Sequence, residues 1–153
     1  MALEERIPAA SVGLWRVRTQ SDSAVLKVIA LGGKHHPRWP VAADESHPYY
    51  WRREACVYES GLLDRLAGLH APECRGVFER TDGSVAVWLE DVPEAPAWTV
   101  EALGAVAERL GRAQAGLAAD PLDETWLSRG WLREYLGIRD IEGPEGGGAG
   151  AAR

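Results

Sequence analysis

The chain has 153 residues, of which 46% are hydrophobic and 26% charged, and its formal net charge is −6 at pH 7. These values are typical of one packed domain and exclude a mostly disordered chain. The acidic balance does not supply the basic surface that nucleic-acid binding requires, and no stretch approaches the about 18 apolar residues of a membrane span. Residues 1–10 lack the apolar run of a signal peptide. We therefore expect a cytoplasmic protein that binds neither nucleic acids nor membranes.

The first half of the chain predicts two strands followed by a long helix. Residues 12–19 alternate between apolar and polar side chains, and residues 24–31 form a second apolar run after a polar turn, which predicts an antiparallel hairpin. A helix is expected over residues 48–67, with Pro48 as its first residue and Gly68 as its stop. Its buried stripe recurs at three- and four-residue steps and consists of Trp51, Ala55, Tyr58, Leu62 and Leu66.

The second half predicts another hairpin and two more helices. Residues 75–92 form two strands around the Asp82-Gly83 dipeptide, which is a strong hairpin signal. Thr99 is a preferred N-cap for a helix that ends at Asp120-Pro121, and residues 124–137 predict a further helix. Residues 142–153 are rich in Gly and Ala and are expected to be disordered. The helix that begins after Thr99 would bury a stripe of apolar residues, which consists of Leu103, Val106, Leu110, Ala113 and Leu117.

Lys27 lies in the middle of the second predicted strand, on the same face as Val25 and Ile29. A lysine in a strand is most often a charged edge residue that discourages aggregation, and Glu54 alone is an ordinary solvated charge of a helix. Together they are more informative. A lysine that emerges between two apolar residues needs a paired anion, and Glu54 on the following helix could supply it.

The element order, two hairpins with one helix between them, is that of the small lobe of the protein-kinase-like fold. The stretches "SAVLKVIAL", "RREA" and "WLEDV" resemble the aminoglycoside phosphotransferase family, which has this fold. The resemblance extends over residues 12–136 and is most specific over residues 51–92. It implies an α+β fold with a kinase-like small lobe over residues 1–92, ending in the hinge, and the first helices of the large lobe over residues 93–141.

This resemblance implies that the chain binds a nucleotide, with ATP as the cofactor. Lys27 would hold the α- and β-phosphates, and Glu54 would hold Lys27 in place. The backbone C=O of Glu90 and the backbone N–H of Val92 would meet the adenine edge. The phosphate-covering loop would lie near residues 8–13, where the sequence departs from the family pattern because it has a single glycine.

The sequence lacks the residues with which this family transfers a phosphoryl group. Family members carry a His-Gly-Asp-x-x-x-x-Asn motif and a later aspartate, which supply the base and the magnesium ligands. This sequence contains no asparagine, and none of its histidines is followed two residues later by aspartate. We therefore assign no catalytic residue and no metal ligand, although Mg²⁺ is expected for the family. A small-molecule acceptor would bind only to a complete large lobe.

Two interpretations stay open. In the first, the chain is the ATP-binding lobe of an ATP-dependent small-molecule phosphotransferase, truncated and inactive alone. In the second, it is a non-catalytic module that keeps the fold to bind a nucleotide or a partner. Truncation would leave apolar residues of the later helices uncovered, so that the chain self-associates through a patch that includes Leu110, Leu117, Trp126 and Trp131.

Overall fold

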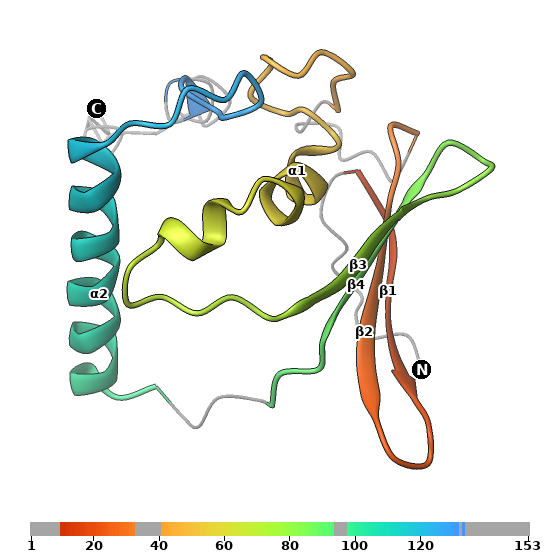
Figure 1. The fold of residues 1–153 in the computed structure, drawn as a ribbon, viewed down its shortest axis with the longest axis horizontal. Coiled ribbons are helices and arrows are strands. Elements are labelled where there is room, and N and C mark those ends of the chain that lie inside the picture. Colours follow the sequence, from red (N-terminus) through yellow and green to blue (C-terminus); the bar gives the residue numbers. More distant parts are fainter. Residues whose placement is uncertain (1–9, 33–40, 94–97, 132, 134–153) are drawn as a thin grey trace, which may run out of the picture.

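A four-stranded antiparallel sheet carries the fold, with one short helix on one of its sides (Figure 1). The computed structural model describes residues 10–32, 41–93, 98–131 and 133. The architecture is α+β, as expected, and a long second helix stands at the side of the molecule away from the sheet. The elements are β1 (Ser11–Arg18), β2 (Ser23–Ile29), α1 (Arg53–Glu59), the 3-10 helix η1 (Leu62–Arg65), β3 (Cys74–Glu79), β4 (Val85–Glu90) and α2 (Val100–Ala119).

Both predicted hairpins are confirmed, and the sheet has the strand order β1-β2-β4-β3. The two hairpins join through β2 and β4, which pair antiparallel with Lys27 opposite Val87. Strand β2 therefore has a neighbour on each side. The interpretation of Lys27 as a residue of an edge strand is consequently wrong, because no edge is present at β2 for it to protect.

The core lies between α1 and one face of the sheet. Because strand side chains alternate between faces, every second residue of the central strands points toward α1. Ala55 of α1 is fully buried against them, and Trp51 and Tyr58 pack at the margin of this cluster. Its strand residues are Ile29, Val85, Val87 and Leu89. Of the predicted stripe, Ala55 is buried and the other four residues are half-buried; Trp51 and Tyr58 pack against this core cluster, whereas Leu62 and Leu66 are not part of it.

The turn between β3 and β4 has the local geometry that Asp82-Gly83 predicts. Gly83 is left-handed, with φ of 76°, and its N–H donates to the carbonyl of Arg80 at 3.0 Å. The Asp82 carboxylate accepts from the N–H and the hydroxyl of Ser84 at 3.0 and 2.6 Å. These hydrogen bonds lower the pKa of Asp82. The turn therefore fixes the register in which β4 enters the sheet.

Replacement of Gly83 by alanine is expected to destabilise the protein by about 1 kcal/mol, since a Cβ disfavours the left-handed conformation. No neighbouring atom lies within 4 Å of that Cβ, so the cost is one of backbone conformation. Gly104 of α2 also has open space, and there alanine is expected to stabilise by about 0.5–1 kcal/mol. Urea unfolding of Gly83→Ala and Gly104→Ala measures both values, and the same sign for the two variants would contradict this account.

The helix predicted over residues 48–67 is shorter than expected, and this prediction is corrected. Residues 43–52 form turns and bends instead, and Tyr50 pairs with Ala42 in an isolated bridge. The Arg53 guanidinium accounts for this, because it binds the carbonyls of His47 and Pro48 and so holds that segment in a turn. At the other end, Gly61 is left-handed with φ of 70°, which separates α1 from η1.

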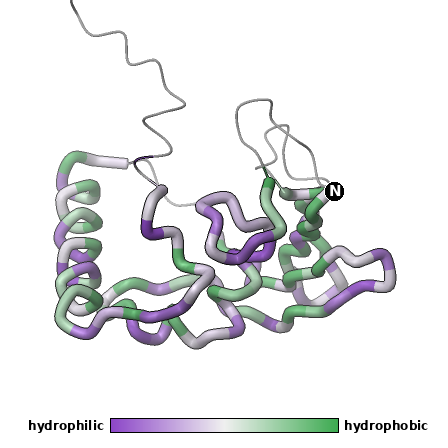
Figure 2. Tube along the Cα trace, turned by 90° about the horizontal axis from the view of Figure 1, so that it is seen from above, coloured by the Kyte–Doolittle hydropathy of each residue, from purple (hydrophilic) through white to green (hydrophobic). Residues whose placement is uncertain are grey.

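Helix α2 begins at the predicted cap but is mostly uncovered. The hydroxyl of Thr99 accepts from the N–H of Ala102 at 3.2 Å. Among the predicted stripe residues, Ala113 is buried and Leu117 half-buried, whereas Leu103, Val106 and Leu110 are exposed. Figure 2 shows hydrophobic and hydrophilic residues alternating along this helix. Asp120, the C-cap of α2, forms an ion pair of 2.6 Å with Arg65 of η1, and α2 packs against η1.

The helix predicted over residues 124–137 is wrong in its first half. Residues 125–130 form turns and bends, while residues 131 and 133 are helical, and residues 134–137 lie outside the described residues. Trp126 is buried rather than exposed, because residues 125–130 fold back toward α1. The backbone carbonyl of Trp126 accepts a hydrogen bond from Arg53 there. Of the residues expected in an exposed patch, Leu110 and Trp131 are indeed exposed, each by 46%.

Other predictions fall on residues that are not described. The Gly- and Ala-rich stretch 142–153 and residues 8 and 9 of the expected phosphate-covering loop belong to these. The later residues of that expected loop, 11–13, are part of strand β1. In the described part of the chain, no helix combines the length and the apolar character needed to cross a membrane.

Candidate functional site

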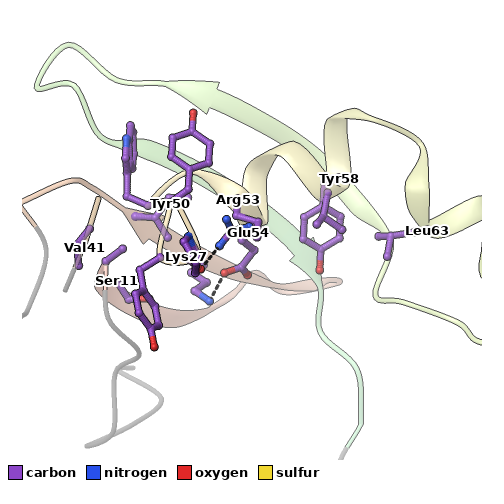
Figure 3. A pocket seen from close by; sticks show the side chains of 14 residues that line it. Ser11, Lys27, Val41, Tyr50, Arg53, Glu54, Tyr58 and Leu63 are labelled. Carbon is purple, nitrogen blue, oxygen red and sulfur yellow. Dashed lines mark hydrogen bonds and ion pairs between the residues drawn. The ribbon is translucent and has the colours of Figure 1, made fainter. Parts of the chain in front are cut away.

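Lys27 and Glu54 form an ion pair that joins the central strand β2 to helix α1 (Figure 3). The Lys27 ammonium donates to Oε2 of Glu54. The Lys27 side chain is 16% exposed and that of Glu54 is 35% exposed, so the pair lies at the margin of the core rather than on an open surface. The geometric prediction that the ammonium reaches the Glu54 carboxylate is confirmed.

The position of Lys27 in the sheet explains why this contact forms. Val25 and Ile29 flank it on the face that packs toward α1, and Val87 is its cross-strand neighbour. The aliphatic stem is therefore enclosed by apolar side chains, and its charged end must leave the core toward an anion. An ammonium has three donors, and Glu54 is its one hydrogen-bond partner among the described residues. The remaining donors can bind an anionic ligand.

An open cavity of about 460 Å³ lies beside this ion pair. This volume falls within the range of about 300–1,000 Å³ that is usual for small-molecule sites. Strands β1 and β2, helix α1 and residues 41–51 enclose it, and Ser11, Lys27 and Glu54 contribute polar groups to its wall. Most of the wall is aromatic or aliphatic, including Ile29, Val41, Tyr49, Tyr50, Trp51 and Tyr58.

Arg53 holds this wall together and was not predicted as a site residue. Its guanidinium donates to three backbone carbonyls, those of His47 at 2.6 Å, Pro48 at 2.5 Å and Trp126 at 2.6 Å. Burial lowers the pKa of Arg53. The three bonds fix the start of α1, and with it the adjacent Glu54, against residues from two distant parts of the chain. No sequence signal could have indicated them, because the partners are backbone atoms.

The neighbouring Arg52 points to a different environment. It forms ion pairs with Glu59 at 2.8 Å and with Glu79 at 2.6 Å, and so ties α1 to the end of β3. The hydrogen bonds to Glu59 are the main reason why the pKa of Arg52 is raised. The two adjacent arginines at the start of α1 therefore have different partners: Arg53 binds backbone carbonyls beside the cavity, and Arg52 binds carboxylates at the surface.

The two predicted hinge residues lie at the other end of β2 from the cavity. Glu90 is opposite Ala24 in the sheet, five positions before Ile29, which corresponds to roughly 17 Å along the strand. The N–H of Glu90 donates to the carbonyl of Glu73 at 2.8 Å. Val92 is 47% exposed, and within the described ranges its N–H has no hydrogen-bond partner. The structure therefore places Lys27 between the predicted hinge and the cavity.

A second ion pair, between Arg16 and Asp91, anchors the chain where it leaves β4. The Nε of Arg16 lies 2.9 Å from Oδ1 of Asp91, and the Asp91 side chain is 10% exposed. Arg16 is opposite Val25, so it shares the sheet face of Lys27. Sequence reasoning missed this pair, because only the strand register shows that these residues, 75 positions apart, meet.

In the described part of the chain, no group of three or more His, Cys, Asp or Glu side chains could hold a metal ion. No family model, no curated protein and no solved structure matches this chain. The resemblance to the aminoglycoside phosphotransferase family therefore stays a prediction that rests on the quoted sequence stretches.

Proposed function

We propose that the chain is a nucleotide-binding unit of protein-kinase-like small-lobe architecture, and that Lys27 binds the phosphates of ATP. The observation that carries the proposal is the Lys27–Glu54 ion pair between a central strand and α1, a helix in the connection between the two hairpins. The strand order also supports it, because the chain segment proposed as the hinge, residues 90–92, continues from the strand beside Lys27.

The positive charge of Lys27 can bind a polyanionic ligand such as a triphosphate. The chain as a whole is acidic, so a triphosphate must be attracted by a local cation rather than by the average field. Lys27 has unused donors, and Glu54 restrains its ammonium in one place, which lowers the entropy lost when a phosphate binds. The distance along β2 from Ala24 to Lys27, roughly 10 Å, leaves room for the adenosine part between the hinge and the phosphates.

The proposal covers binding and assigns no turnover to these residues. An ATP-dependent phosphotransferase that acts on a small molecule is the enzyme class in which such a unit would serve. Its base, its magnesium ligands and its acceptor contacts would come from a large lobe, because this sequence has no asparagine and no suitably placed His-x-Asp. A cytoplasmic location agrees with the use of ATP and with Cys56 and Cys74, which are both free thiols.

Calorimetric titration with ATP, AMP and adenosine in magnesium-containing buffer tests the proposal. If the phosphates provide the main contact, ATP should bind about 10-fold or more tightly than adenosine, because hydrogen bonds to a charged group contribute about 1.5–3 kcal/mol. AMP should be intermediate. Equal affinity for ATP and adenosine would contradict a phosphate contact at Lys27.

A second candidate function is partner binding through α2, and the exposed stripe of this helix favours it. Leu103, Val106 and Leu110 follow one another at three- and four-residue steps and are all exposed. Consecutive exposed apolar residues on one helix face are typical of a face that packs against another helix. We propose a second copy of the chain as that partner, with or without bound nucleotide.

Light scattering over a range of concentrations tests this second candidate. The unmodified chain should become larger with concentration, and Leu103→Glu combined with Leu110→Glu should make it monomeric, since two carboxylates would have to be buried in the contact. Ala105→Glu combined with Ala115→Glu is the matched control, because it adds the same two charges to exposed residues of α2 outside the stripe. A concentration-independent monomer for the unmodified chain would exclude self-association.

A further inference from the structure

The cavity beside the ion pair has features that the proposed nucleotide contact does not use. It lies on the side of Lys27 away from the proposed hinge, where Ile29 ends β2 and Ser11 begins β1. Neither Glu90 nor Val92 lines it. A nucleotide that extends from the hinge to Lys27 would therefore leave most of this space free.

The walls of the cavity are suited to a flat apolar molecule. Residues 49–51 contribute three consecutive aromatic side chains, and Tyr58 of α1 contributes a fourth. Burial raises the pKa of Tyr50 and of Tyr58, which is consistent with a poorly hydrated wall. Aromatic side chains favour stacked or edge-to-face contacts with another ring.

One polar group in this wall lacks a partner. Ser11 is 1% exposed, and its hydroxyl has no hydrogen-bond partner among the described residues. A buried hydroxyl without a partner costs free energy, and a ligand atom that accepts its proton would recover it. Unlike the Ser11 hydroxyl, the charged side chains of the wall have hydrogen-bond partners: Lys27 donates to Glu54, and Arg53 donates to three backbone carbonyls. We assign the remaining Lys27 donors to the proposed phosphate contact, which leaves the Ser11 hydroxyl as the polar group that this cavity offers to a second ligand.

We propose that this cavity binds an uncharged, flat heteroaromatic molecule of one or two fused rings, whose acceptor atom accepts a hydrogen bond from the Ser11 hydroxyl. The ligand contacts α1, β2 and residues 41–51 together, so it holds α1 against the sheet and raises the stability of the protein. Lys27 and Glu54 lie where this site and the proposed nucleotide contact adjoin, but the ligand uses neither of them as a hydrogen-bond partner and does not require bound nucleotide.

Quinoline and naphthalene are matched probes, because they share size and shape and only quinoline has an acceptor nitrogen. Binding is followed by backbone amide NMR, with a dissociation constant for quinoline on the order of 0.1–1 mM expected for a ligand of this size. Quinoline should bind about two- to tenfold more tightly than naphthalene, which is the usual contribution of one hydrogen bond. The shifted amides should be those around Ser11 and Val57, and not those of Phe78 and Trp88.

Ser11→Ala should abolish the preference for quinoline while leaving the stability of the free protein unchanged or higher, since the hydroxyl it removes has no partner among the described residues. Val57→Phe, which fills the cavity, should weaken both probes. The negatively charged 2-naphthoate should bind no more tightly than naphthalene. Saturating ATP should leave quinoline affinity unchanged, and Lys27→Met should retain quinoline binding while losing ATP.

Three results would overturn the proposal: equal affinity for quinoline and naphthalene, an unchanged preference in Ser11→Ala, or tighter binding of 2-naphthoate than of quinoline. Displacement of quinoline by ATP would also overturn it, because the cavity would then belong to the nucleotide site. That last result would leave the proposed nucleotide function intact. Failure of the cavity proposal can therefore be distinguished from failure of the nucleotide proposal.

Discussion

Replacement of Lys27 by methionine is expected to weaken ATP binding by about 10- to 100-fold, which corresponds to the loss of hydrogen bonds from a charged donor. Methionine keeps an unbranched apolar stem between Val25 and Ile29, so the core contacts are preserved. The Glu54 carboxylate, which is 35% exposed, can turn toward water when its partner is lost. The fold should therefore persist while the phosphate contact disappears. Calorimetric titration with ATP measures the effect.

Lys34→Met is the matched control for this variant, because Lys34 is the only other lysine in the sequence. It removes the same charge from the acidic chain, so a loss caused by net charge alone should appear equally in this variant, and we expect a change of at most about twofold. Circular dichroism checks that both variants are folded. Equal losses in the two variants would mean that net charge, and not the position of Lys27, determines nucleotide binding.

Arg53→Lys is expected to cause the largest loss of stability of any single conservative change at the site, about 2–4 kcal/mol. The guanidinium reaches three carbonyls at once, and a lysine ammonium, a compact point charge, cannot reproduce that planar arrangement. The segment around His47 and the segment around Trp126 would both lose their attachment to α1. Urea unfolding followed by tryptophan fluorescence measures the change.

Arg52→Lys is the control at the adjacent position, the N-cap of α1. Its partners, Glu59 and Glu79, are exposed carboxylates, and surface ion pairs of this kind contribute about 0–1 kcal/mol. We therefore expect Arg52→Lys to change stability by less than about 1 kcal/mol. If the two variants were equally stable, the hydrogen bonds of Arg53 to the three carbonyls would not determine the conformation of residues 43–52.

The hairpins could be predicted because their signals are local. Alternating side chains set the faces of β1 and β2, and the Asp82-Gly83 dipeptide places the turn between β3 and β4 without any distant contact. The pairing of Lys27 with Glu54 could be predicted as well, because a buried lysine requires an anion and the next helix carries one. The hairpin signals lie within a few residues of sequence, whereas the ion pair joins residues 27 positions apart and was predicted from the order of strand and helix.

The other features depend on contacts between distant residues. The periodicity of residues 48–67 is helical throughout, but Arg53 binds carbonyls that precede and follow α1, and this tertiary contact overrides local propensity. The burial of Trp126 follows from the same arginine. The ion pair of Arg16 with Asp91 and the buried hydroxyl of Ser11 become visible only when the strand register is known.

The central claim, that the Lys27 ammonium contacts nucleotide phosphate, is tested most directly by acylation with an acyl-phosphate derivative of ATP. The amine of a lysine beside the phosphates attacks the acyl carbon, an amide forms, and ATP leaves as the acyl–oxygen bond breaks. Mass spectrometry of the peptides then distinguishes Lys27 from Lys34 within one sample. We predict that Lys27 is acylated and that excess ATP suppresses this labelling, while Lys34 reacts to the same extent with and without ATP. Labelling of Lys27 that excess ATP does not reduce would contradict the account.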